Sequence, residues 1–551
     1  MYTVSENNIH QILTYSDVYN DKIPDLKNEI ALLNIHKSIS IISELIRVRN
    51  ILLNDIPVLG GIFSLPFEVI LKKWFGIIPQ SSEDLKRNPL FRKNVHIISV
   101  QMLLLLLKKI IQYGDIDTIN NIDYSITEED YKKIIQLQLI VAEELDKKHS
   151  KKTDVNHFLY STYHFNSNKN VAHEFLRMYY MLERLSQNRT AFDDDVQNEY
   201  KDYYTDFSNK YGFTPTQYSS LLFGELNMYY SEIRGLTKSS IWRDTNDIYE
   251  KTKVKDIIPF VIDTLSKPVE WYCKWTNESE DYEWDFSKFY EFPFIKDNSG
   301  KYISICDITL TNAFFEKLFW LIRDCYPKED DNAMAFFGRL FEKYIQDITE
   351  AATGGKYQYI KEFTYKIRKD LKKSSDAYIR KDTELLVIEA KGFSVLFNCM
   401  ARNESVEKNN KKIFIDPVLQ ADICLFNVID NKPDFSGVNN AYIISVTMDN
   451  INAVPNYYNN IHKTIDNEKK CDKTKYYYNF NIEEYEMLLY LIEKNYDIFA
   501  ILKDYYNCQK LKPFSNFLLE IYPDISMTSF MKNIYKEAAE EMKKIVFGNE
   551  S

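Results

Sequence analysis

Residues 384–393, ELLVIEAKGF, contain a run typical of a buried strand, followed directly by a pair of charged side chains. Leu385 to Ile388 are four consecutive apolar residues, and Glu389 and Lys391 follow them. Because side chains alternate across a strand, Glu389 and Lys391 are expected on the same face. Such a pair is either a plain ion pair or part of a metal-dependent active site, and the surrounding sequence decides between the two.

The spacing Glu-x-Lys is not informative by itself, because it also occurs at 199–201, 468–470 and 541–543. Those three copies lie in polar or helical surroundings, where charged surface residues are the ordinary interpretation. Only the copy at 389–391 follows an apolar run typical of a buried strand.

Segments on both sides of this strand predict a compact α/β core over residues 331–450. The second helix of this core is expected to begin at Asp416, as its N-cap, with Pro417 in the first turn. The expected order is helix, three strands, helix and strand, at 331–352, 356–366, 376–380, 384–393, 416–429 and 441–448.

The chain has 551 residues, enough for two to four domains. Residues 1–285 read mostly as amphipathic helix, 286–330 as a hairpin and helix connector, and 451–551 as helical again. The predicted fold class is therefore multidomain α plus α/β, in which large helical N-terminal and C-terminal regions flank the core.

Two more carboxylates are expected close to Glu389. Asp376 begins the preceding strand, and because sequential strands usually pair, it should lie beside Glu389 across a hairpin. Glu342 lies on the helix before the strands, one turn after Gly338, where the missing side chain allows a backbone or a substrate to approach. Carboxylates grouped in this way suit Mg²⁺ or Mn²⁺, which activates a bound water and offsets charge on a phosphoryl group. Lys391 would orient that water or stabilise the phosphate.

This order of elements and acids resembles the PD-(D/E)XK nuclease superfamily, the restriction-endonuclease-like fold. Asp376 matches the first motif acid of that family, and Glu389 and Lys391 match its E-x-K. Glu342 resembles the acid on the family's first core helix. Gln420 is similar to a glutamine on the next helix of some branches.

Two positions depart from the family pattern. Ser375 replaces the proline before the first acid, and Cys424 stands where a tyrosine would follow Gln420. The resemblance implies a restriction-endonuclease-like core with a mixed sheet. It also implies that three acids hold the metal: Asp376, Glu389 and Glu342. Two further residues, Lys391 and Gln420, would take part in catalysis.

The charge of the chain is unevenly distributed. The net charge is −11, but residues 354–412 hold fourteen Lys or Arg and eight Asp or Glu, a net of +6 that leaves −17 elsewhere. Part of this basic segment, 366–373, reads equally as a nucleic-acid contact or as a solvated loop. The candidates to hold a phosphate backbone are Lys366, Arg368, Lys369, Lys372, Lys373, Arg380 and Lys381.

The cysteine pattern and the apolar stretches predict a cytoplasmic protein. Seven scattered cysteines without a C-x-x-C pair indicate neither a disulfide framework nor a zinc site. The first ten residues are polar, which predicts that no signal peptide is present. Charged residues interrupt the apolar stretches 56–79 and 95–111, so both are expected to be buried helices rather than membrane spans.

Two functions are consistent with these features. The first is a Mg²⁺- or Mn²⁺-dependent nuclease, acting most naturally on DNA. Its helical N-terminal region would recognise the substrate, bind a protein partner or build a homo-oligomer. By analogy with the family, such a chain would serve in microbial defence against foreign DNA. The second is a non-catalytic nucleic-acid-binding or assembly protein built on a nuclease-like scaffold.

Overall fold

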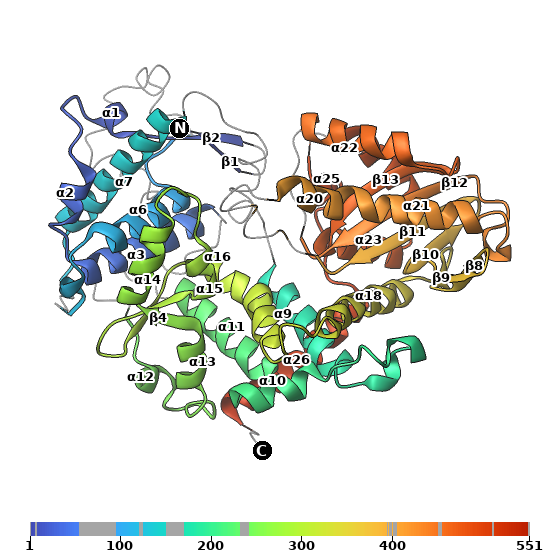
Figure 1. Cartoon of the computed structure of the whole chain (residues 1–551), viewed down its shortest axis with the longest axis horizontal. Helices are drawn as coiled ribbons and strands as arrows, with labels where there is room; N and C mark the ends of the chain where they lie inside the picture. Colours follow the sequence, from blue (N-terminus) through green and yellow to red (C-terminus); the bar gives the residue numbers. More distant parts are fainter. Residues whose placement is uncertain are drawn as a thin grey trace.

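The structure is a computed structural model that describes residues 2–5, 8–53, 95–120, 125–149, 170–231, 242–393, 395, 399, 405–449, 455–509 and 512–548. Helices dominate the N-terminal half, and a five-stranded sheet lies in the C-terminal half (Figure 1). This arrangement confirms the multidomain α plus α/β layout with helical N-terminal and C-terminal regions.

The N-terminal elements form a helical layer with a small sheet. In this sheet, β1 and β2 pair in an antiparallel manner and β2 and β3 in a parallel manner. The elements are β1 (Tyr2–Ser5), β2 (Asn8–Ile12), α1 (Tyr15–Val18), α2 (Leu26–Ile30), α3 (Ile35–Leu53), β3 (Val95–His96), α6 (Val100–Tyr113), η2 (Ile116–Asn120) and α7 (Glu128–His149).

The middle of the chain is again mostly helical. It contains the expected hairpin around residues 297–300, where β5 pairs with β6. The elements are α9 (Val171–Tyr179), η3 (Tyr180–Leu185), η4 (Arg189–Ala191), η5 (Asp194–Val196), α10 (Tyr203–Tyr211), α11 (Pro215–Ser231), α12 (Thr245–Tyr249), α13 (Ile258–Leu265), β4 (Ser266–Pro268), α14 (Val269–Glu278), α15 (Ser287–Glu291), β5 (Phe294–Lys296), β6 (Tyr302–Ser304), α16 (Asp307–Asn312), η6 (Ala313–Lys317) and α17 (Leu318–Arg323).

The C-terminal half contains the large sheet, whose strand order is β13-β12-β11-β10-β7. The elements are α18 (Asn332–Ala352), β7 (Gln358–Lys361), β8 (Thr364–Ile367), β9 (Asp370–Lys373), β10 (Ala377–Lys381), β11 (Glu384–Lys391), α20 (Val406–Asn410), η7 (Lys411–Ile415), α21 (Asp416–Val428), η8 (Pro433–Phe435), β12 (Asn440–Thr447), α22 (Pro455–Glu468), β13 (Thr474–Asn481), α23 (Ile482–Glu493), α24 (Ile498–Cys508), α25 (Phe514–Ile521) and α26 (Ser529–Phe547).

The sheet is mixed. Strands β7, β10 and β11 are antiparallel neighbours, whereas β12 and β13 run parallel to β11. Side chains of α18 and α23 share the hydrophobic cluster on one face, and side chains of α21 and α22 share the cluster on the other. Both faces are therefore covered, which explains the nearly continuous apolar sequence of β11.

Hydrophobic contacts cross the boundaries expected at 285 and 330. One cluster joins α3, α6 and α7 to the β5–β6 hairpin, and the largest cluster joins α9 and α11 to α18, to the sheet and to α26. The helical regions and the sheet therefore share continuous cores.

Several local predictions need correction. The segment expected as one strand over 356–366 is divided between β7 and β8, and the run 366–373 forms the hairpin β8–β9 rather than a loop. Asp416 is not an N-cap, because η7 leads directly into α21. Strands β1, β2, β3 and β13 were not predicted. The apolar stretch 56–79 lies outside the described residues, and no described helix is long and apolar enough to cross a membrane.

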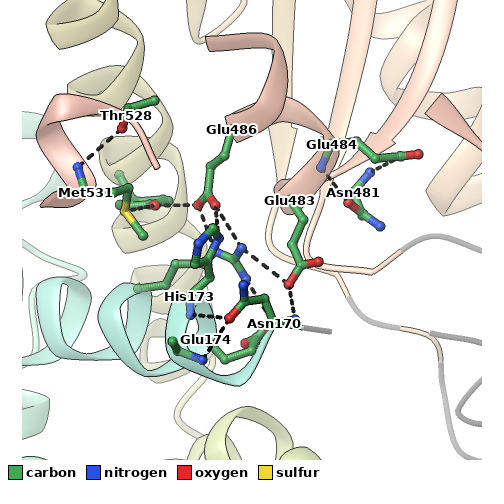
Figure 2. Close-up of polar contacts among 12 residues, drawn as sticks. Asn170, His173, Glu174, Asn481, Glu483, Glu484, Glu486, Thr528 and Met531 are labelled. Carbon is green, nitrogen blue, oxygen red and sulfur yellow. Dashed lines mark hydrogen bonds and ion pairs between the residues drawn. The ribbon is translucent and has the colours of Figure 1, made fainter. Parts of the chain in front are cut away.

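A buried ion cluster connects α9 to α23 (Figure 2). The Arg177 side chain is completely buried. Its Nε and one Nη donate to Glu486 at 2.8 and 2.9 Å, and its other Nη donates to Glu174 at 2.8 Å. Tyr344 of α18 donates its hydroxyl to Glu486 at 2.6 Å, and His173 Nδ1 lies 3.3 Å from the same carboxylate. Three helices far apart in sequence are thus joined at one carboxylate.

The cluster makes the stability of the protein sensitive to acid. Burial alone would raise the pKa of Glu486, but the charge and hydrogen bonds of Arg177 lower that pKa from 4.5 to about 2. The folded state therefore binds this proton less readily than the unfolded state. We expect this difference to contribute about 3 kcal/mol to the free energy of unfolding. The contribution is complete above pH 4.5 and is lost as the pH falls toward 2. Thermal unfolding measured from pH 6 to pH 3 tests this, with Glu486→Gln as the variant that should lose this part of the pH dependence.

Candidate active site

Two acids and the lysine of the predicted site, Asp376, Glu389 and Lys391, meet at one end of β10 and β11. In this antiparallel pair, Ala377 lies opposite Ile388, and the backbone N–H of Asp376 donates to the carbonyl of Ile388 at 3.1 Å. Asp376 is 7% exposed and Glu389 is 2% exposed. The expected pairing of the two acids across a hairpin is therefore present, and both carboxyl groups are buried.

Strand alternation places these side chains on the face that α21 covers. Leu385 and Val387 pack in the cluster with α21, and Glu389 and Lys391 follow them at the same parity. Nearby, the hydroxyl of Tyr378 on β10 lies 3.5 Å from the thiol of Cys424 on α21. The site thus lies at the strand ends, next to the inner side of this helix.

Burial and mutual repulsion act together on the two acids. Burial raises the pKa of Asp376 well above its usual range, and the charges of Glu389 and Glu342 raise it further. Burial also raises the pKa of Glu389, while Lys391 opposes this shift. Burial and mutual repulsion therefore destabilise the charged forms of the two carboxyl groups, and a bound cation would stabilise those forms.

Lys391 is fixed by the neighbouring carboxylate. Its Nζ donates to Glu389 Oε1 at 2.8 Å. Burial opposes the charged amine, but the charges of Glu389 and Asp376 raise the pKa of Lys391 above its usual value. The amine is therefore a charged hydrogen-bond donor held at the edge of the acid pair.

Two oxygen atoms of the site are suited to a metal ligand set. Glu389 Oε2 and the hydroxyl of Ser375 are buried, and neither makes a hydrogen bond of regular geometry within the described residues, although the Ser375 hydroxyl lies close enough to Glu389 to lower its pKa. Asp376 directs Oδ2 to the backbone N–H of Ala390 at 2.6 Å. No group of three or more His, Cys, Asp or Glu residues in the described part of the chain lies so that it could hold a metal ion. Asp376 and Glu389 nevertheless fit a Mg²⁺ or Mn²⁺ ion, because such ions bind through one or two carboxylates together with water and substrate oxygen.

Glu342 is close to the acid pair but is engaged elsewhere. Its Oε2 accepts a hydrogen bond from Arg339 at 2.9 Å, and its charge raises the pKa of both Asp376 and Glu389. The expected close approach at Gly338 is not seen within the described residues, because a methyl group added at Gly338 would meet no atom within 4 Å; a methyl group added at Gly392 would instead lie 3.6 Å from the Gly338 Cα.

Gln420 lies on α21, one turn before Cys424, with its side chain exposed to solvent. No described interaction draws it toward the carboxylates. Cys424 instead lies near the site, because the charge of Glu389 contributes to the raised pKa of its thiol after the larger effect of burial.

The seven basic candidates separate into two groups. Arg380 donates to the carbonyls of Asp382, Asp434 and Ser436, at 3.1 Å for Asp382 and 2.6 Å for Ser436. Lys381 pairs with Asp497 at 2.8 Å, and Lys373 pairs with Asp195 at 2.8 Å. The remaining four, which lie exposed on the β8–β9 hairpin, are Lys366, Arg368, Lys369 and Lys372.

The hairpin begins directly before the site. The N–H of Phe363 donates to Ser374 Oγ at 3.0 Å, and the N–H of Ser374 donates to the Phe363 carbonyl at 2.8 Å. Asp376 follows only two residues later. The two-residue turn of the β8–β9 hairpin places Arg368 at a φ of 56°, a left-handed conformation of the kind that suits tight hairpin turns. The basic side chains of the hairpin therefore lie just before Asp376, at the start of β10.

Sequence reasoning missed Arg339 and Glu362. Arg339 precedes Glu342 by three residues on one helix, a spacing at which oppositely charged side chains commonly pair. Glu362 lies between β7 and β8 and accepts from Gln346 at 3.3 Å. The first could have been found from its spacing, whereas the second depends on the position of the hairpin.

Comparison of the chain with protein-family models, with curated proteins and with solved structures gives no match. The geometry of the site is therefore the basis for a functional proposal.

Proposed function

We propose that the protein is a divalent-metal-dependent nuclease that hydrolyses phosphodiester bonds, with DNA as the favoured substrate. The observation that carries this proposal is the buried pair of Asp376 and Glu389 at the strand ends, with Lys391 hydrogen-bonded to Glu389. The strand order, and the helix before and after the strands, support the resemblance to PD-(D/E)XK nucleases. The defence role expected from that resemblance, and a cytoplasmic location, stay predictions.

Each residue has a distinct task in this proposal. Asp376 and Glu389 would hold Mg²⁺ or Mn²⁺, and Glu342 would add negative charge beside them. When bound, such an ion supplies positive charge to the phosphoryl group and activates a water for attack. Lys391 donates hydrogen bonds from a charged amine, which stabilises the negative charge that develops on the phosphate. Burial excludes bulk water and strengthens these interactions.

Incubation of the full chain with duplex DNA, single-stranded DNA and RNA tests the proposal. Cleavage is expected with Mg²⁺ or Mn²⁺ and should stop when EDTA is added. Binding of nucleic acid without cleavage under every metal condition would instead favour the non-catalytic alternative. If the chain neither binds nor cleaves any of these substrates, both functions are excluded.

The exposed hairpin should provide part of the substrate affinity. Reversing Lys366, Lys369 and Lys372 to glutamate should weaken binding to duplex DNA and make its salt dependence shallower. Each lost phosphate contact lowers the log–log salt slope by about 0.9. Fluorescence anisotropy at several salt concentrations measures this slope. The control is Lys381→Gln, which removes a charge already paired with Asp497; an equal effect in the control would show that the hairpin is not a specific contact.

A further inference from the structure

Two cations beside the candidate site are each shared between two acids. Arg339 lies 3.0 Å from Glu199 and 2.9 Å from Glu342. Lys373 lies 2.8 Å from Asp195 and 3.8 Å from Glu362. In each case, one acid belongs to the core around the sheet, and the other belongs to residues 189–200, between α9 and α10. We call residues 189–200 the acidic strap.

The acidic strap packs on α18 through aromatic contacts. Phe192 and Tyr200, near its two ends, pack against Phe336 with ring centroids 5.0 and 5.1 Å away. Val196 is buried in the largest hydrophobic cluster. The strap backbone is therefore held in place, while its acidic side chains reach the two cations.

The two cations border the acid pair that would hold the metal. Arg339 contacts Glu342, whose charge acts on Asp376 and Glu389. Lys373 ends the hairpin strand that leads through Ser374 and Ser375 to Asp376. Both cations thus lie close to the residues that would hold the metal, and both keep exposed surface, with 33% of each side chain accessible.

We infer that Arg339 and Lys373 are phosphate-binding residues of the substrate path, and that Asp195 and Glu199 occupy their positions as internal substitutes for phosphate until nucleic acid displaces them. This inference rests on the proposed nuclease function. A phosphate is a better partner than these acids, because it offers several charged oxygens to one cation and because each exposed ion pair contributes little by itself. The strap then works as a competitor that selects for ligands of high charge density.

Binding measurements on the full chain test the inference. We use Glu389→Gln as the parent, in EDTA, so that cleavage does not interfere, and labelled duplex DNA, single-stranded DNA and RNA as probes. Combining Asp195→Asn with Glu199→Gln should tighten binding by roughly tenfold at low salt, because two repelling charges are removed. The matched control is Asp194→Asn, since Asp194 is an exposed neighbour in the same strap; its effect should be much smaller.

The cations provide the second measurement. Lys373→Ala should weaken binding to duplex DNA and lower the log–log salt slope by about 0.9, and Lys373→Arg should restore the slope. A purely structural lysine would change thermal stability without changing the slope. The inference is overturned if the double strap variant binds no more tightly than Asp194→Asn, or if the slope of Lys373→Ala is unchanged. If no variant binds any probe, both the inference and the proposed function fail. If the variants bind but the strap substitutions do not change the affinity, only the inference fails.

Discussion

Replacing Glu389 with glutamine should abolish the proposed nuclease activity, with a loss of about 10³-fold or more. The carboxylate is almost completely buried, its Oε2 makes no hydrogen bond of regular geometry within the described residues, and its Oε1 accepts from Lys391 at 2.8 Å. Glutamine keeps the shape and one acceptor oxygen but removes the charge that would bind the metal. Single-turnover cleavage assays with saturating Mn²⁺ measure the loss.

The design includes a control on the same strand. Glu384 lies at the opposite end of β11 and accepts a hydrogen bond from Asn440 at 2.9 Å. Glu384→Gln can keep that bond and should retain full activity. Asp376→Asn should be inactive and also more stable without metal, because it relieves repulsion with Glu389 while its oxygen can still accept from Ala390. Full activity of Glu389→Gln would refute the assignment of the site.

Replacing Arg177 with methionine should produce the largest loss of stability, about 3–5 kcal/mol. The guanidinium is completely buried, and its removal leaves the carboxylates of Glu174 and Glu486 without their charged partner. Because the cluster joins α9, α18 and α23, the effect should appear as a lower unfolding midpoint for the whole chain rather than as local loosening. Thermal and urea unfolding, followed by tryptophan fluorescence, measure it.

A nearby arginine provides the control. Arg184 pairs with Glu537 at 2.9 Å, but half of its side chain is exposed. Arg184→Met should cost less than about 1 kcal/mol, because water screens exposed pairs. Equal effects of the two substitutions would show that burial does not determine the contribution of these ion pairs.

The sequence was most informative where one periodicity dominated. The apolar run before Glu389 predicted β11, and the alternation of side chains correctly placed Glu389 and Lys391 on one face. The amphipathic pattern of 331–352 likewise predicted α18. These features depend on residues close in sequence, whose geometry is fixed by the strand or the helix itself.

Features that depend on distant partners could not be predicted in this way. Strand β9 is exposed along its whole length, so it lacks the apolar alternation that identifies a strand. The pairing of Lys373 with Asp195 joins residues 178 positions apart. Gln420 was chosen by resemblance, and only the orientation of α21 shows that its side chain faces solvent.

The position of α26 has a consequence for how the protein is made. Met531, Ile534 and Ala538 of this helix lie in the same hydrophobic cluster as α9 and α11. Synthesis on the ribosome delivers α26 after every other described element, so the apolar surfaces of α9 and α11 wait uncovered while the intervening residues are added. At typical elongation rates this interval is roughly tens of seconds. The folded core should therefore reach protease resistance only after α26 has left the exit tunnel.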